Sequence, residues 1–205
     1  NVIPVTFKKT NLVVEYFSGK RLKGEGKIDT NFNEKSRIKH AYLEPRVMIN
    51  PEARREILQS DWLIIGPGDL YTSTISILLV NSVKQIITQS KAKIIYVMNL
   101  MTKSGQTNDY QASDHLADLK NYLGREPEFI LINESKIPKK IIEWYRGYRE
   151  KPVINNINNN FSGRIIVGDL IKKTAHIKSD ADRLTRSILR HDPKKLAKVI
   201  ANIIL

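Results

Sequence analysis

The sequence predicts an α/β fold, with a mainly parallel sheet, helices on both of its faces and a β-hairpin excursion near the N-terminus. Four short apolar runs alternate with helical segments, an order typical of a parallel sheet covered on both sides. The chain has 205 residues, of which 41% are hydrophobic, which is enough to bury a core of its own. We expect residues 1–205 to form a single α/β domain.

The hairpin is expected first along the chain. Residues 11–17 are rich in strand-forming side chains, residues 18–20 (SGK) favour a turn, and residues 21–29 read as a second extended stretch. A further short strand is expected over residues 37–43. A helix then begins at Pro51, since proline is tolerated in a first helical turn.

The parallel sheet is predicted from four apolar runs, at residues 62–65, 94–97, 129–132 and 164–167. Helices are expected between and after them, at residues 70–89, 113–123, 138–149, 181–189 and 192–204. The asparagine-rich tract 155–160 is expected to be an exposed loop, because asparagine tolerates turn conformations.

Composition and charge exclude several classes of protein. No run approaches the roughly 18 apolar residues that span a bilayer, so we expect no membrane span. With no cysteine there is neither a disulfide nor a thiolate metal site, and a reducing cytoplasm is the expected setting. The net charge of +13 favours polyanions, but lysine and arginine are spread over the whole length, so we do not expect a nucleic-acid partner.

Ligands of open parallel sheets bind beyond the carboxyl ends of the strands, and the loop after the first apolar run has suitable chemistry. Residues 66–69 (GPGD) lead from a strand into a helix, where backbone N–H groups and the helix dipole favour a phosphate. Thr72 and Ser73 would add hydroxyl donors. The same turn also reads as a plain connector, and Asp69 beside a phosphate requires a metal ion, a sugar hydroxyl or a helix cap next to it.

The loop after the second run, residues 99–110, is long for such a unit, and long loops in compact domains are often functional. Ser113 and Asp114 are explained by the start of the next helix, and a direct role in binding is the alternative. His115 is expected to be neutral beside that helix start.

Arginines at positions 183, 186 and 190 recur at helical spacing near the C-terminus. On one helix face they would form an anion clamp, or simply a solvated surface. His191-Asp192-Pro193 is expected to begin the final helix, with Asp192 as its N-cap.

Several long motifs together resemble the YvcK-type gluconeogenesis factor family of the CofD-like superfamily. They are GPGDLYTS at 66–73, YVMNLMT at 96–102, GQT at 105–107, SDH at 113–115 and RHDP at 190–193. The resemblance implies a Rossmann-like fold, a cytoplasmic bacterial protein, and a regulatory role linked to carbon metabolism, cell-wall synthesis and cell shape. It implies binding of a UDP-sugar such as UDP-N-acetylglucosamine, without a cofactor. The family's N-terminal Gly-rich segment has no counterpart here, so the chain resembles the latter two-thirds of the family.

The resemblance also supplies candidate ligand-binding residues, carried over by position. They are Gly66, Gly68, Asp69, Thr72, Ser73, Asn99, Thr102, Thr107, Ser113, Asp114, His115, Tyr148 and Arg190. Arg190 would hold a diphosphate through its fork of N–H donors, and Tyr148 would stack on uracil, with Tyr145 as the alternative ring.

Two other hypotheses stay open. The second is a magnesium-dependent transferase of the 2-phospho-L-lactate transferase type, with Asp69 or Asp114 holding the Mg²⁺ ion. The third is a nucleic-acid-binding module, which rests on the net charge alone. The fold family implies a homodimer, although the sequence indicates no interface, and no catalytic residue is assigned.

Overall fold

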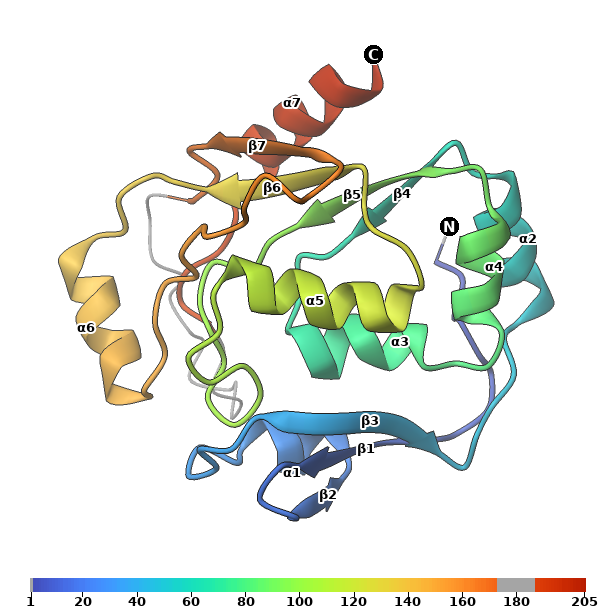
Figure 1. Ribbon diagram of the computed structural model, residues 1–205, viewed down its shortest axis with the longest axis horizontal. Coiled ribbons are helices and arrows are strands. Elements are labelled where there is room, and N and C mark those ends of the chain that lie inside the picture. Colours follow the sequence, from blue (N-terminus) through green and yellow to red (C-terminus); the bar gives the residue numbers. More distant parts are fainter. Residues whose placement is uncertain (1, 173–186) are drawn as a thin grey trace.

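The computed structural model describes residues 2–172 and 187–205, which form two sheets and the helices around them (Figure 1). The smaller sheet is antiparallel, with strand order β2-β1-β3. Its strands are β1 (Asn11–Tyr16), β2 (Arg21–Lys23) and β3 (Ile38–Glu44). The predicted hairpin is present, and β3 joins it as a third strand.

The extended stretch expected over residues 21–29 is wrong beyond Lys23. Glu25–Asp29 form the short helix α1. Gly24, at φ 99, ends the strand and its carbonyl accepts from the backbone N–H of Ile28 at 3.2 Å. The turn places Ile28 in the core, fully buried, and this packing outweighs the strand pattern.

The larger sheet is the predicted parallel one, with strand order β4-β5-β6-β7. Its strands are β4 (Trp62–Ile65), β5 (Lys93–Val97), β6 (Phe129–Asn133) and β7 (Arg164–Gly168). All four predicted runs are confirmed. The central strands are the most deeply buried, whereas Ile64 and Val167 on the two edge strands are 47% and 46% exposed.

Helices cover both faces of the parallel sheet, as predicted. One face is covered by α2 (Pro51–Gln59), η1 (Leu70–Ile75, a π-helical segment), α3 (Ser76–Leu78), α4 (Val83–Gln89) and α5 (Ala112–Leu123). In Figure 1, α3 and α5 lie beneath the strands, and α2 and α4 stand at the right. On the other face, α7 (Pro193–Ile204) packs half-buried Leu196, Val199, Ile200 and Ile203 against the strands. The helix α6 (Lys139–Gly147) lies to one side.

Two predicted helices differ from the structure. The helix expected over residues 70–89 is interrupted between α3 and α4, where Ser82 takes the left-handed φ of 75°. The helix expected over residues 181–189 falls mostly outside the described residues, as do the arginines at 183 and 186 of the expected clamp, and residues 187–189 are not helical. At the final helix, Asp192 caps the backbone N–H groups of Lys194 and Lys195 as predicted.

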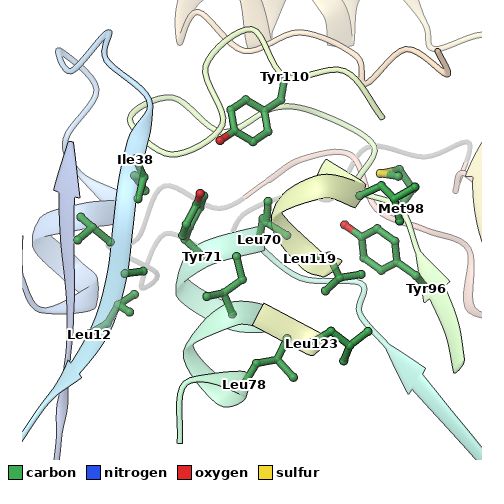
Figure 2. Packing of buried hydrophobic residues seen from close by; sticks show 14 of the residues in the cluster. Leu12, Ile38, Leu70, Tyr71, Leu78, Tyr96, Met98, Tyr110, Leu119 and Leu123 are labelled. Carbon is green, nitrogen blue, oxygen red and sulfur yellow. The ribbon is translucent and has the colours of Figure 1, made fainter. Parts of the chain in front are cut away.

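One hydrophobic cluster connects the two sheets. Leu12 and Ile38 of the small sheet face Tyr71 and Leu78 of the η1 and α3 helices, and α5 lies beyond them (Figure 2). The small sheet therefore packs on helices and not on the parallel sheet. Within residues 2–172 and 187–205, no helix has the length and apolar character needed to cross a membrane.

Candidate functional site

A cavity of about 690 Å³ lies at the carboxyl ends of β4 and β5, where the topology rule predicts a site. Five segments line it: the loop after β4, the loop after β5, the α1 region of the small sheet, the end of α6 with the residues that follow it, and the chain leading into α7. The sequence-predicted residues that line the cavity are Gly68, Asp69, Ser73, Asn99, Thr102 and Arg190.

The loop after β4 is shaped by two local constraints. Gly66 has φ 80, and a side chain there would approach the carbonyl oxygen of Val97 to 3.0 Å, so only glycine fits without strain. The Asn99 side-chain amide donates to the carbonyl of Gly68 at 2.7 Å. This bond fixes the loops after β4 and β5 relative to each other, which holds Asp69 at the cavity wall.

The loop after β5 is held by its own threonines. The Thr107 hydroxyl accepts from the backbone N–H of Lys103 at 2.8 Å, and the Thr102 hydroxyl accepts from the backbone N–H of Lys151 at 2.9 Å. Both threonines are buried. Their effect is to position the Lys103 side chain at the cavity.

The small sheet contributes one wall because the same loop holds it. The Ser104 hydroxyl donates to the carbonyl of Phe32 at 3.2 Å, and the Tyr16 hydroxyl donates to the carbonyl of Gly105 at 2.8 Å. These contacts bring Glu25, Asp29 and Phe32 to the cavity.

Carboxylates crowd one side of the cavity around Lys103. The Lys103 ammonium lies 3.6 Å from the Glu150 carboxylate, and the two side chains are 17% and 5% exposed. Burial raises the pKa of Glu150, and Lys103 opposes that shift. Burial also raises the pKa of Asp69, with Lys103 lowering it and Asp29 raising it. The pKa of Glu25 is raised by burial and by the charges of Asp29 and Asp69. A ligand that donates hydrogen bonds, or brings a cation, would relieve this crowding.

The opposite chain segment supplies a cation, an imidazole and a ring. Arg190 is exposed at the cavity, and its backbone carbonyl accepts from Lys172 N–H at 2.9 Å. Burial lowers the pKa of His191 to about 4, although a hydrogen bond to the backbone of Met98 acts to raise that pKa. The His191 ring is therefore neutral at pH 7. Among the described residues its Nε2 atom is buried without a partner. The Tyr145 ring lines the cavity, and its hydroxyl accepts from Leu189 N–H at 3.0 Å.

The remaining sequence-predicted residues lie outside the lining: Gly66, Thr72, Thr107, Ser113, Asp114, His115 and Tyr148. Tyr145, the alternative ring, lines the cavity in place of Tyr148, whose ring packs 4.5 Å from that of Trp144, centroid to centroid. Thr72 donates to Asp29 at 3.0 Å and thereby orients a cavity carboxylate.

Ser113, Asp114 and His115, at the start of α5, make contacts away from the cavity. The Ser113 hydroxyl accepts from the side-chain amide of Asn156 at 2.8 Å. The Asp114 carboxylate pairs with Arg37 at 2.7 Å and accepts from the backbone N–H of Gln111, which is the N-cap of α5. His115 is fully buried, and burial lowers its pKa to about 4. It is neutral, as predicted, although the main cause is burial.

Sequence reasoning missed Glu25, Asp29, Phe32, Lys103 and Glu150. Glu25 and Asp29 stand four residues apart, a spacing that places both on one helix face and that could have drawn attention to them. The strand predicted there hid this signal. For the Mg²⁺ of the transferase hypothesis, no group of three or more histidine, aspartate or glutamate side chains in residues 2–172 and 187–205 is arranged to hold a metal ion.

Comparisons with known proteins agree with this architecture. A family model described as 2-phospho-L-lactate transferase CofD matches residues 1–171. A Thermotoga maritima protein bearing the gluconeogenesis factor name is 36% identical over 98% of this chain and 62% of its own length. The gluconeogenesis factor of Bacillus subtilis is 31% identical over 99% of this chain and 61% of its own length.

The fold is also that of a solved structure. A Bacillus halodurans protein described as a member of the UPF0052 family superposes with a TM-score of 0.82 at 27% identity, over 97% of this chain and 60% of that one. The chain thus spans about three fifths of the length of these relatives. The match over residues 1–171, together with the similarity to curated proteins along nearly the whole chain, shows that it belongs to the CofD family, among the gluconeogenesis factors.

Proposed function

We propose that this chain binds a nucleotide sugar, of the type of UDP-N-acetylglucosamine, in the cavity at the ends of β4 and β5, and acts as a metabolite-responsive regulator. The observation that carries the proposal is the composition of the cavity wall. Lys103 and Arg190, from two separate segments, provide cations, while Asp29, Asp69 and Glu150 provide acceptors. A nucleotide sugar carries a diphosphate and many hydroxyls, and it needs both kinds of partner.

The dimensions of the cavity support the same ligand class. Its volume of about 690 Å³ falls within the range of roughly 300–1,000 Å³ that is usual for small-molecule sites. Phe32, which is half-buried, lines it with an aromatic ring on which a base can stack. Arg190 offers two parallel N–H donors to a diphosphate, and neutral His191 offers a ring nitrogen. The regulatory role, in carbon metabolism, cell-wall synthesis and cell shape, follows from the family resemblance.

Titration of this chain with UDP-N-acetylglucosamine tests the proposal. At 1 mM ligand and a Kd of about 10 µM, binding to the folded state alone adds about 2.7 kcal/mol, which raises the Tm of a chain this size by about 5–10 °C. Arg190→Ala is expected to weaken binding by about 10- to 100-fold, since it removes a charge-assisted hydrogen bond. Arg46→Ala is the matched control, because it removes an exposed arginine outside the cavity. No Tm rise with the UDP-sugar would reject the proposal.

A transferase acting on a nucleoside diphosphate donor with Mg²⁺ is the second candidate. The observation that favours it is the negative charge of Glu25, Asp29 and Asp69 at the cavity, where Asp29 raises the pKa of both other carboxyls. These carboxylates are not arranged to hold a metal ion by themselves, so the Mg²⁺ would enter bound to the diphosphate of the donor. The family model bears a transferase description as well. A Tm rise with GDP that requires Mg²⁺, and that is absent with the UDP-sugar, would favour this candidate.

A further inference from the structure

A second cavity of about 890 Å³ adjoins the first and has different chemistry. It lies between the chain that follows α1, the loop after β5, and the end of α6. Phe32 and Glu150 line both cavities and separate them. Nothing in the proposed nucleotide-sugar site uses the rest of its lining.

Three cations at this cavity have no carboxylate partner among the described residues: Lys35, Arg146 and Arg149. The acidic side chains of the lining are already engaged. Glu150 pairs with Lys103 at 3.6 Å, and Asp109 pairs with Lys151 at 2.6 Å. Glu34 lies 3.7 Å from Lys20. The cavity therefore presents positive charge that its own carboxylates do not neutralise.

Backbone strain is concentrated at the same cavity. In the described residues, three positions other than glycine have a positive φ, and two of them, Asp109 at 57° and Arg149 at 59°, line this cavity. Glycine would fit the left-handed conformation at residue 149 without cost. The chain instead places a guanidinium there, just past the end of α6.

The apolar part of the lining is aromatic and partly open. The Tyr110 ring is buried and has the Arg37 guanidinium 4.6 Å from its centroid, and Phe32 is half-buried. Ile154 is 63% exposed. An exposed large apolar side chain at the edge of a cationic cavity is suited to contact with a ligand.

We propose that this second cavity is a binding site for a small aromatic anion, a molecule in which a phosphate or carboxylate group stands next to a flat apolar ring. The guanidinium groups of Arg146 and Arg149, with Lys35, hold the anionic group. The ring lies against Phe32, Pro152 and Ile154. Because Glu150 and Phe32 also face the first cavity, an occupant of one cavity alters the surroundings of the other.

Phenyl phosphate is the probe that tests this site, with amide chemical shifts as the readout on this chain. We expect the largest shifts in residues 32–35, 104–111, 142 and 146–154, which line this cavity. Inorganic phosphate and benzyl alcohol, which each carry half of the recognised chemistry, should bind at least about tenfold more weakly. Arg149→Gly is expected to weaken phenyl phosphate about tenfold while raising the Tm, because glycine relieves the left-handed backbone.

Two controls keep this test independent of the nucleotide-sugar proposal. Arg46→Ala, which removes an exposed arginine elsewhere, and Arg190→Ala, in the first cavity, should both leave phenyl phosphate binding within twofold of the unchanged chain. Wild-type affinity in Arg149→Gly would overturn the proposal. So would shifts that map to the first cavity, or equal binding of inorganic phosphate.

Discussion

Removing the Lys103 ammonium should destabilise the folded chain, because this cation is surrounded by carboxylates that have lost much of their water. It lies 3.6 Å from the Glu150 carboxylate, and the side chains are 17% and 5% exposed. It also lowers the pKa of Asp69. Lys103→Met keeps most of the length of the side chain and removes the ammonium group with its charge and its N–H donors.

The magnitude follows from the geometry. At 3.6 Å and an effective dielectric constant of about 20, the gross attraction between Lys103 and Glu150 is about 5 kcal/mol. Removing one partner of a buried pair typically costs about 3–5 kcal/mol. Because 3.6 Å is longer than a direct hydrogen bond, we expect the lower end, about 3 kcal/mol at pH 7. In a chain of this size that lowers the Tm by about 6–12 °C.

The loss should shrink in mild acid. Burial raises the folded-state pKa of Asp69 and Glu150 above their unfolded values, so the folded chain holds these protons more tightly and is stabilised as the pH falls toward those unfolded values. Without Lys103, which lowers both pKa values, the shift is larger. Protonation then removes the unpaired charge, and the penalty of Lys103→Met should be smaller at pH 5 than at pH 7.

Urea unfolding at pH 7 and pH 5 measures both effects. The series needs Lys103→Met, Glu150→Gln and the double variant, in which the penalty of Lys103→Met should be reduced because its main partner is already neutral. Lys91→Met is the matched control, since Lys91 is exposed and has no carboxylate within reach among the described residues. A cost below about 0.5 kcal/mol at pH 7, or an equal cost at both pH values, would refute the electrostatic account of the cavity.

Two further predictions concern the scaffold. Gly105→Ala should cost at least about 3 kcal/mol of folding free energy, because φ is 77° and the new methyl group would collide with the carbonyl of Asn31. Gly19→Ala, at φ 83 in open space, should cost only about 1 kcal/mol. Equal losses of Tm in the two variants would contradict this. The folded-state pKa of His115 is about 4, so on acidification the unfolded chain takes up the proton first and the free energy of unfolding falls. His115→Leu should therefore reduce the loss of unfolding free energy between pH 7 and pH 5 by about 2 kcal/mol. The same pH dependence of unfolding in the variant and the unchanged chain would rule this out.

The parallel sheet could be predicted from the sequence because each strand carries its own signal. Residues 94–97 and 129–132 are apolar on both faces, and the structure buries them between α5 and α7. The loops that follow β4 and β5 could be located for the same reason. Once the strands are placed, their carboxyl ends share one edge of the sheet.

The rest of the site depends on tertiary contacts that no local pattern records. Glu25 and Asp29 reach the cavity because Ile28 enters the core and forces a helical turn, and Phe32 follows because Ser104 bonds its carbonyl. Tyr145 and Tyr148 are three residues apart on or just after α6, and both pack against Trp144. Tyr145 is the one at the cavity, where its hydroxyl accepts from the N–H of Leu189 in the chain that leads into α7. Such choices are decided by neighbours distant in the sequence.

A crystal structure of this chain with UDP-N-acetylglucosamine tests the central claim most directly. The account predicts the ligand in the cavity at the ends of β4 and β5, with its diphosphate within hydrogen-bonding distance of Lys103 and Arg190 and its hydroxyls bonded to Asp69 or Glu150. A ligand seated elsewhere, or a diphosphate that contacts neither cation, would contradict it.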